Sequence, residues 1–99
     1  MADETYIRDL ANRIRSKFSQ SELPEKGLDE LFNAYAVLAL SKGTAVTNED
    51  VHDAWSAWAT KFDPDNKSLV PFSELSSETQ RFDTPFTKAI REVALELPR

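Results

Sequence analysis

Apolar residues recur along this chain at the three- and four-residue spacings that place them on one face of an α-helix. Four stretches carry such a stripe, namely residues 3–18, 28–42, 47–62 and 85–97. Elsewhere, no segment shows the strict alternation of apolar and polar residues that marks a half-buried strand. The pattern therefore predicts an all-α fold, a small bundle of about four main helices around one core.

The first predicted helix has charged residues where the helix dipole favours them. Asp3 and Glu4 suit its positive N-terminal end, and Asp9 stands four residues before Arg13, at the spacing of an ion pair on a solvated face. Its apolar stripe consists of Ile7, Leu10, Ala11, Ile14 and Phe18.

The second stretch is apolar over more than half of its surface, so we expect this helix at the centre of the bundle. Tyr35 is expected in the core with its hydroxyl at the rim, and Gly43 at the left-handed position that ends such helices. The predicted buried face consists of Leu28, Leu31, Phe32, Tyr35, Leu38 and Ala39, broadened by Val37 and Leu40.

The third and fourth helices have clear end signals. Thr47 is the expected N-cap of the third, and the Asp-Pro pair at 63–64 ends it. Pro85 is expected at the first position of the last helix, with Asp83 or Thr84 as its cap. Their stripes consist of Val51, Trp55, Trp58 and Phe62, and of Phe86, Ala89, Ile90, Val93, Ala94 and Leu97.

The segment 63–84 is less regular. DPDNKS predicts a turn-rich loop, and LVPF predicts extended chain that leads into a helical turn at SEL. SSETQRF predicts another short helix, with Ser76 or Ser77 as its cap.

Composition narrows the class of protein. The 99 residues suffice for one domain, 1–99. The absence of cysteine excludes disulfides, a cysteine nucleophile and a thiolate metal site. No apolar run approaches the roughly 20 residues of a membrane span, and charges interrupt the start too early for a signal peptide. We therefore expect a cytoplasmic protein, bacterial or in a host, without membrane contact.

The charge is negative and uneven. A net charge of −5 argues against nucleic-acid binding, which depends on clustered Lys and Arg. Residues 21–50 carry two basic and six acidic groups. This acidic segment is either a solvated surface or a patch that meets a basic partner.

One loop resembles a calcium-binding EF-hand. Counted from Asp63, a twelve-residue loop would place Asp65 at position 3 and Glu74 at position 12. However, Lys67 stands at a ligand position, and Ser68 replaces the glycine of the sharp turn. An ordinary Asp-Pro loop is the better interpretation, so we expect no metal site.

Candidate catalytic groups are sparse. The chain has one histidine, no cysteine and no recognisable serine motif. The carboxylates that are neighbours in sequence do not specify an acid and a base with separated pKa values. We therefore predict a protein that is not an enzyme and needs no cofactor.

The third helix carries a candidate aromatic platform. On a helical wheel, His52 lies at the edge of the apolar stripe, beside Trp55. Such a pair can stack on and hydrogen-bond a planar ligand. The alternative, favoured by the pattern alone, is that both tryptophans lie in the core and His52 bonds a neighbouring carbonyl.

The same region resembles the RyR repeat domain, the family named after the ryanodine receptor. The resemblance rests on H-x-x-W at 52–55, L-V-P-F-x-x-L at 69–75, Glu78 and Asp83, and it extends over residues 51–97. Between the two motifs, RyR domains usually carry a Gly-Trp-x-Tyr-Gly element that helps to form their ligand pocket. Here the shorter TKFDPDNK stands instead.

The resemblance implies a non-catalytic module for a nucleotide-derived ligand. In that case His52 and Trp55 would flank the base, and Phe72 would replace the tyrosine of the proline turn. To this we add Lys61, with Lys67, as a candidate phosphate contact because of its proximity in sequence. The whole chain is also similar to small uncharacterised proteins of actinobacteria and their phages.

Together these observations predict a small binding module. The first hypothesis is a protein-interaction or adaptor protein, phage-encoded and acting on a host factor through its acidic segment or exposed helix faces. The alternative is a small-ligand domain of RyR type, with His52, Trp55, Lys61 and Phe72 as its ligand-binding residues.

Overall fold

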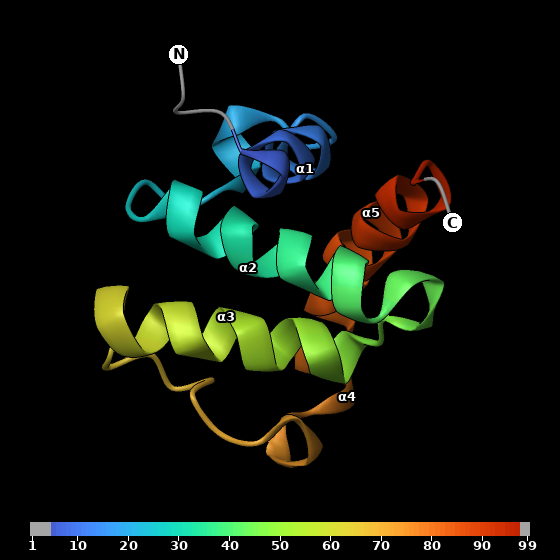
Figure 1. The fold of residues 1–99 in the computed structure, drawn as a ribbon. Helices are drawn as coiled ribbons and strands as arrows, with labels where there is room; N and C mark the ends of the chain where they lie inside the picture. The colour runs from blue at the N-terminus through green and yellow to red at the C-terminus, as the bar shows by residue number, and fades with distance from the viewer. Residues whose placement is uncertain (1–4, 98–99) are drawn as a thin grey trace.

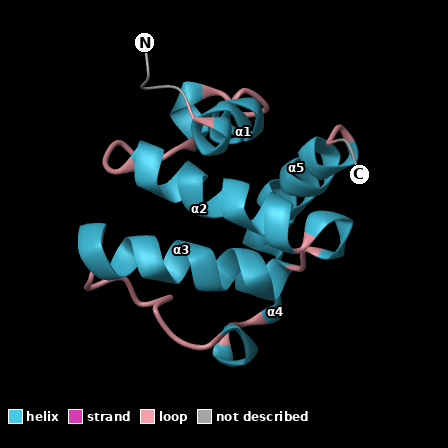
Figure 2. Cartoon of the chain, viewed as in Figure 1, coloured by secondary structure: helices cyan, strands magenta, loops and turns pink. Residues whose placement is uncertain are grey.

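The computed structural model describes residues 5–97, and every regular element in this range is helical (Figure 2). The prediction of a small all-α domain is therefore confirmed. The main helices are α1 (Tyr6–Arg15), α2 (Leu28–Ser41), α3 (Asn48–Phe62) and α5 (Thr84–Leu95), and α4 (Ser77–Gln80) is a single turn. Short 3₁₀ turns are η1 (Gln20–Glu22), η2 (Gly43–Ala45), η3 (Phe72–Glu74) and η4 (Arg81–Asp83).

Helix α2 lies at the centre of the bundle, as predicted. Figure 1 shows α2 and α3 side by side and antiparallel, with α1 crossing above α2 and α5 crossing behind both. Helix α2 accordingly contacts α1, α3 and α5. After α3 the chain turns back and runs along α3 to α4, so the irregular segment covers the face of α3 that is turned away from α2.

Local signals set most of the helix ends as predicted. The Thr47 hydroxyl accepts from the Asp50 backbone N–H at 3.1 Å, and Asp50 Oδ2 accepts from the Thr47 N–H at 3.0 Å, which completes a capping box. Gly43 has a φ of 58°, the left-handed conformation that ends α2. The Ser76 hydroxyl caps α4 by accepting from the Thr79 N–H.

The first helix is shorter than its apolar stripe. It ends at Arg15, so Phe18 lies beyond the helix. The ring of Phe18 stacks on that of Phe86, with 4.6 Å between the ring centroids. The ion pair between Asp9 and Arg13 forms, at 3.2 Å. The predicted dipole contacts of residues 3 and 4 lie outside the described residues.

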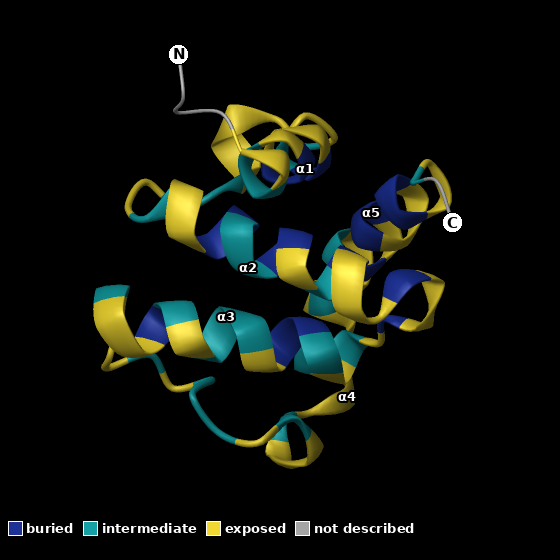
Figure 3. Cartoon of the chain, viewed as in Figure 1, coloured by how far each residue is buried: buried dark blue, intermediate teal, exposed yellow. Residues whose placement is uncertain are grey.

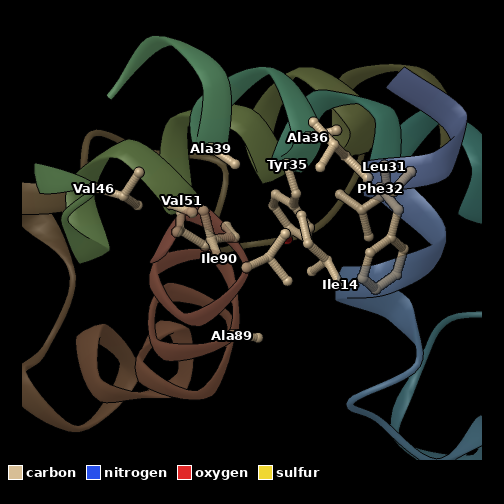
Figure 4. Packing of buried hydrophobic residues seen from close by; sticks show 14 residues of the cluster. Ile14, Leu31, Phe32, Tyr35, Ala36, Ala39, Val46, Val51, Ala89 and Ile90 are labelled. Atoms are coloured by element: carbon tan, nitrogen blue, oxygen red, sulfur yellow. The ribbon is translucent and has the colours of Figure 1, made fainter. Parts of the chain in front are cut away.

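The core lies where α1, α2 and α5 meet the start of α3. Figure 4 shows side chains of all four helices pointing into this space. Each large apolar side chain that is fully buried contributes about 1.5–3 kcal/mol to the free energy of unfolding. The largest of them are Ile14, Leu31, Phe32, Tyr35, Val46, Val51, Ile90 and Val93.

The predicted buried face of α2 was too wide. Val37 is 50% exposed and Leu40 is 36% exposed, whereas Tyr35, Ala36 and Ala39 are sealed. Helix α2 has neighbours on three sides, and its remaining side faces solvent, as the yellow bands on it in Figure 3 show. Among residues 5–97, no helix is both long and apolar enough to cross a bilayer.

Candidate functional site: a cleft beside His52

A cleft of about 280 Å³ opens where α2, α3 and the return segment meet the start of α5. Its walls are mainly apolar, and its polar groups come from four different parts of the chain. The apolar lining includes Leu31, Trp55, Leu75, Phe82 and Phe86. The polar lining includes Tyr35, His52, Asn66, Ser68 and Asp83.

His52 is held firmly in the wall of the cleft. The residue is only 3% exposed, and its Nε2 lies 2.7 Å from the carbonyl oxygen of Val70. Because a carbonyl only accepts hydrogen bonds, Nε2 must carry a proton, and Nδ1 of the neutral ring is then an acceptor. The ring stacks on Trp55 at 5.6 Å and contacts Phe72 at 6.0 Å between centroids. His52 thus makes the predicted hydrogen bond to a neighbouring carbonyl, and it also lines the cleft.

Tyr35 presents a hydroxyl that makes no hydrogen bond to the other residues of the range 5–97. Its ring packs edge-on against Phe32 and tilted against Phe86, and the residue is 1% exposed. In the described part of the chain, no side-chain nitrogen or oxygen is both sealed from solvent and unpaired. The hydroxyl of Tyr35 and Nδ1 of His52 make no hydrogen bond to these residues, so both must reach solvent through the cleft that they line.

Asp83 contributes the charge of the cleft. It stands at the N-cap position of α5, but its side chain makes no capping bond. Instead its backbone carbonyl accepts from the Thr87 hydroxyl at 3.1 Å, and the half-buried carboxylate lines the cleft. Burial raises the pKa of Asp83 to about 6, although the nearby His52 lowers it in part. Burial, together with the negative charge of Asp83, also raises the pKa of Tyr35.

Of the residues predicted to bind a ligand, His52 and Trp55 line the cleft side by side. A planar base held between two rings requires a separation of about 7 Å between those rings, twice the contact distance. The centroids of His52 and Trp55 are only 5.6 Å apart, so the two rings stack on each other and form one wall of the cleft. Phe72 packs against the ring of His52 and does not line this cleft. Lys61 lies elsewhere, paired with Glu30 at 3.2 Å on the surface.

The second tryptophan has a structural position. Trp58 Nε1 donates to the carbonyl oxygen of Gly27 at 3.1 Å, and its ring stacks on Phe62. Gly27 has a φ of 66° at the N-cap of α2, where a Cβ would lie 2.6 Å from that indole nitrogen. Both tryptophans are therefore half-buried, but only Trp55 lines the cleft.

Sequence reasoning gave Tyr35 and Asp83 other roles, the first as a core residue and the second as a helix cap. The available signal for Asp83 was its place in the RyR-like pattern, just before the last helix. For Tyr35 it was the single hydroxyl on an otherwise apolar helix face. Neither signal indicated that these groups would share a cleft with His52.

A wider groove of about 800 Å³ runs between the first turn of α3 and α5. Several of its polar groups are paired with each other or with the backbone. Asn48 donates to the hydroxyl of Thr84 and accepts from that of Thr87, and Arg91 donates to the carbonyl oxygen of Val46. Because these four side chains are already paired, whereas the hydroxyl of Tyr35 and Nδ1 of His52 are not bonded to residues 5–97, the smaller cleft is the better candidate site.

The loop that resembles an EF-hand is held by its own hydrogen bonds. Asp63 Oδ2 accepts from the amide of Asn66, and Asn66 Oδ1 accepts from the backbone N–H of Ser68, each at 2.8 Å. Within the described range, no group of three or more His, Asp or Glu side chains is placed to hold a metal ion.

Comparison with known proteins identifies a family without a known function. Neither the curated proteins nor the solved structures contain a match to this chain. The resemblance to the RyR repeat domain stays a prediction. One family model, described as a domain of unknown function (DUF7701), matches residues 5–95. Since this match covers most of the 99 residues, the chain belongs to the DUF7701 family.

Proposed function

We propose that this protein is a non-enzymatic module that binds a small organic ligand in the cleft beside His52. The observation that carries the proposal is the convergence on one apolar cleft of three polar groups that make no hydrogen bond to residues 5–97. They are the hydroxyl of Tyr35, Nδ1 of His52 and the carboxylate of Asp83. Few precisely placed polar groups within apolar walls are the usual construction of a ligand site.

The size of the cleft limits the ligand. Pockets that enclose drug-sized molecules measure about 300–1,000 Å³, and this one measures about 280 Å³. A ligand of one or two rings, or a compact branched group, matches that volume. Aromatic walls favour a ligand with polarisable or cationic surface.

The polar groups support binding over catalysis. Within residues 5–97, no hydrogen bond joins any two of Tyr35, His52 and Asp83. Nucleophilic catalysis requires a nucleophile in hydrogen-bond contact with its base. The proton on His52 Nε2 is also occupied by the Val70 carbonyl.

The proposal can be tested with the intrinsic fluorescence of Trp55. A Trp58→Phe background leaves Trp55 as the only tryptophan, and a panel of small heterocycles and amines is titrated against it. Ser68→Phe should block the cleft and abolish any response, whereas Ser73→Phe adds the same ring at an exposed position outside it. If ligands bind equally well to both variants, the cleft is not the site.

A second candidate function is that of the predicted adaptor protein. In this case the chain is phage-encoded and binds a host protein in the cytoplasm. The observation that favours it is the pair Val37 and Leu40, exposed one turn apart on the free side of α2. A partner recovered from host lysate by the native chain should be lost with Val37→Glu and Leu40→Glu and retained with Ser68→Phe. Equal recovery by the doubly substituted chain would rule out this face.

A further inference from the structure

The cleft beside His52 has an unusual charge pattern for a nucleotide site. Its lining residues in the described structure include one carboxylate, Asp83, and no lysine or arginine. Lys61, the predicted phosphate contact, is paired with Glu30 on the surface and does not line the cleft. An anionic phosphate placed here would meet the charge of Asp83 without a compensating cation.

The hydrogen-bonding groups of the cleft share one property, which is that each can accept. The carboxylate of Asp83 accepts at both oxygens, and the oxygen of Tyr35 has free lone pairs. Nδ1 of His52 accepts as well, because the proton of the neutral ring is on Nε2, bonded to Val70. Three acceptors around one small space complement a ligand that donates hydrogen bonds or carries positive charge.

Aromatic rings form much of the remaining wall. Tyr35, Trp55, Phe82 and Phe86 all line the cleft, and rings of this kind attract cations through the negative charge on their faces. Phe86 is fixed by stacking on Phe18, whereas Phe82 is 67% exposed at the rim. An organic cation would thus contact Phe86 inside the cleft and Phe82 at its mouth.

We propose that the ligand of this cleft is an organic ammonium ion, whose alkyl groups pack against the aromatic walls while its charge faces Asp83. This inference rests on the proposed binding function and names the ligand class for it. The same chemistry occurs in free quaternary amines and in methylated lysine side chains of proteins. The volume of about 280 Å³ accommodates either head group.

The decisive probes are choline and 3,3-dimethyl-1-butanol, which have the same shape and differ in charge. Binding of each to the full chain is measured by calorimetry and by Trp55 fluorescence in the Trp58→Phe background. Choline should bind on the order of tenfold more tightly or better, because only the cation is attracted electrostatically by the rings and by Asp83. A peptide with trimethyllysine, compared with its unmethylated form, distinguishes a protein-borne source from a free amine.

The matched variant is Asp83→Asn, which keeps the shape and removes the charge. It should reduce choline affinity about tenfold and weaken the binding of the neutral alcohol much less, because the alcohol carries no charge for Asp83 to attract. In the native chain, choline affinity should also rise as the pH increases through about 6, where Asp83 ionises. The other titratable groups that face Asp83 are His52 from α3 and Tyr35 from α2. A pH dependence that persists unchanged in Asp83→Asn would overturn the assignment of the attracting charge to Asp83.

The outcomes separate this inference from the proposed function. Equal affinity for choline and the alcohol, with no effect of Asp83→Asn, would overturn the cation preference while the cleft remained a binding site. Tighter binding of inorganic phosphate or a nucleotide than of choline would also overturn it. If neither probe nor any member of the wider ligand panel binds, both proposals fail.

Discussion

Replacing Asp83 by asparagine should make this protein more stable at neutral pH. The carboxylate of Asp83 ionises in the folded chain at about 6 instead of its ordinary pKa of 3.8, because folding partly removes it from water. At 1.36 kcal/mol for each pKa unit, that difference corresponds to about 3 kcal/mol as an upper limit. Since the group is only half-buried, solvent screening reduces this to about 1–2 kcal/mol.

The sign of the pH dependence follows from proton binding. Between pH values of about 4 and 6 the folded state holds the Asp83 proton more tightly than the unfolded state does. The contribution of Asp83 to the free energy of unfolding therefore falls as the pH rises through this window, and it is constant at higher pH. Asparagine does not titrate, so its advantage should be absent near pH 4 and complete near pH 8.

Urea denaturation followed by tryptophan fluorescence provides the assay. Native chain and Asp83→Asn are compared at several pH values between about 4 and 8, and Asp65→Asn, at an exposed loop position, is the control for loss of one surface charge. The difference in unfolding free energy should grow with pH for Asp83→Asn and stay flat for the control. Equal stability near pH 8, or parallel curves, would refute the reasoning.

Four further substitutions test other parts of the structure. Gly27→Ala should destabilise by about 2–3 kcal/mol, since it strains a left-handed residue and displaces the indole of Trp58; a wild-type midpoint in urea would contradict this. Thr47→Ala should cost about 1 kcal/mol through loss of the capping box, and rescue is not expected from Thr47→Val, which keeps the shape but not the oxygen. Tyr35→Phe should change the free energy of unfolding by less than about 1 kcal/mol, because its hydroxyl has no hydrogen bond to residues 5–97 to lose. Lys61→Ala should be within about 0.5 kcal/mol of the native chain, since both members of its ion pair are exposed, and a larger loss would show a role beyond that pair.

Features that depend on a few neighbouring residues could be predicted well from the sequence. The cap at Thr47 needs an oxygen and a free backbone N–H three residues later, both of which the local sequence supplies. Gly43 ends α2 because glycine adopts a positive φ without strain. The order of the helices and most of their stripes followed from the same local rules.

Features that depend on what lies opposite a residue could not be predicted in this way. Val37 and Leu40 belong to an apolar helix, yet no other element within residues 5–97 covers that side of α2. The periodicity of one helix carries no information about which of its sides has a neighbour. Phe18 continues the stripe of α1 in sequence but stacks on Phe86 from outside the helix.

The sequence by itself determined an all-α domain and the helical position of His52 beside Trp55. Only the tertiary structure decided that Tyr35 and Asp83, 48 positions apart in the chain, meet these two residues at one cleft. The physical reason is that a ligand site depends on distances and burial between elements, which periodicity within one element does not encode. It also depends on the return of the chain along α3, which brings Val70 to His52 and Asp83 to Tyr35.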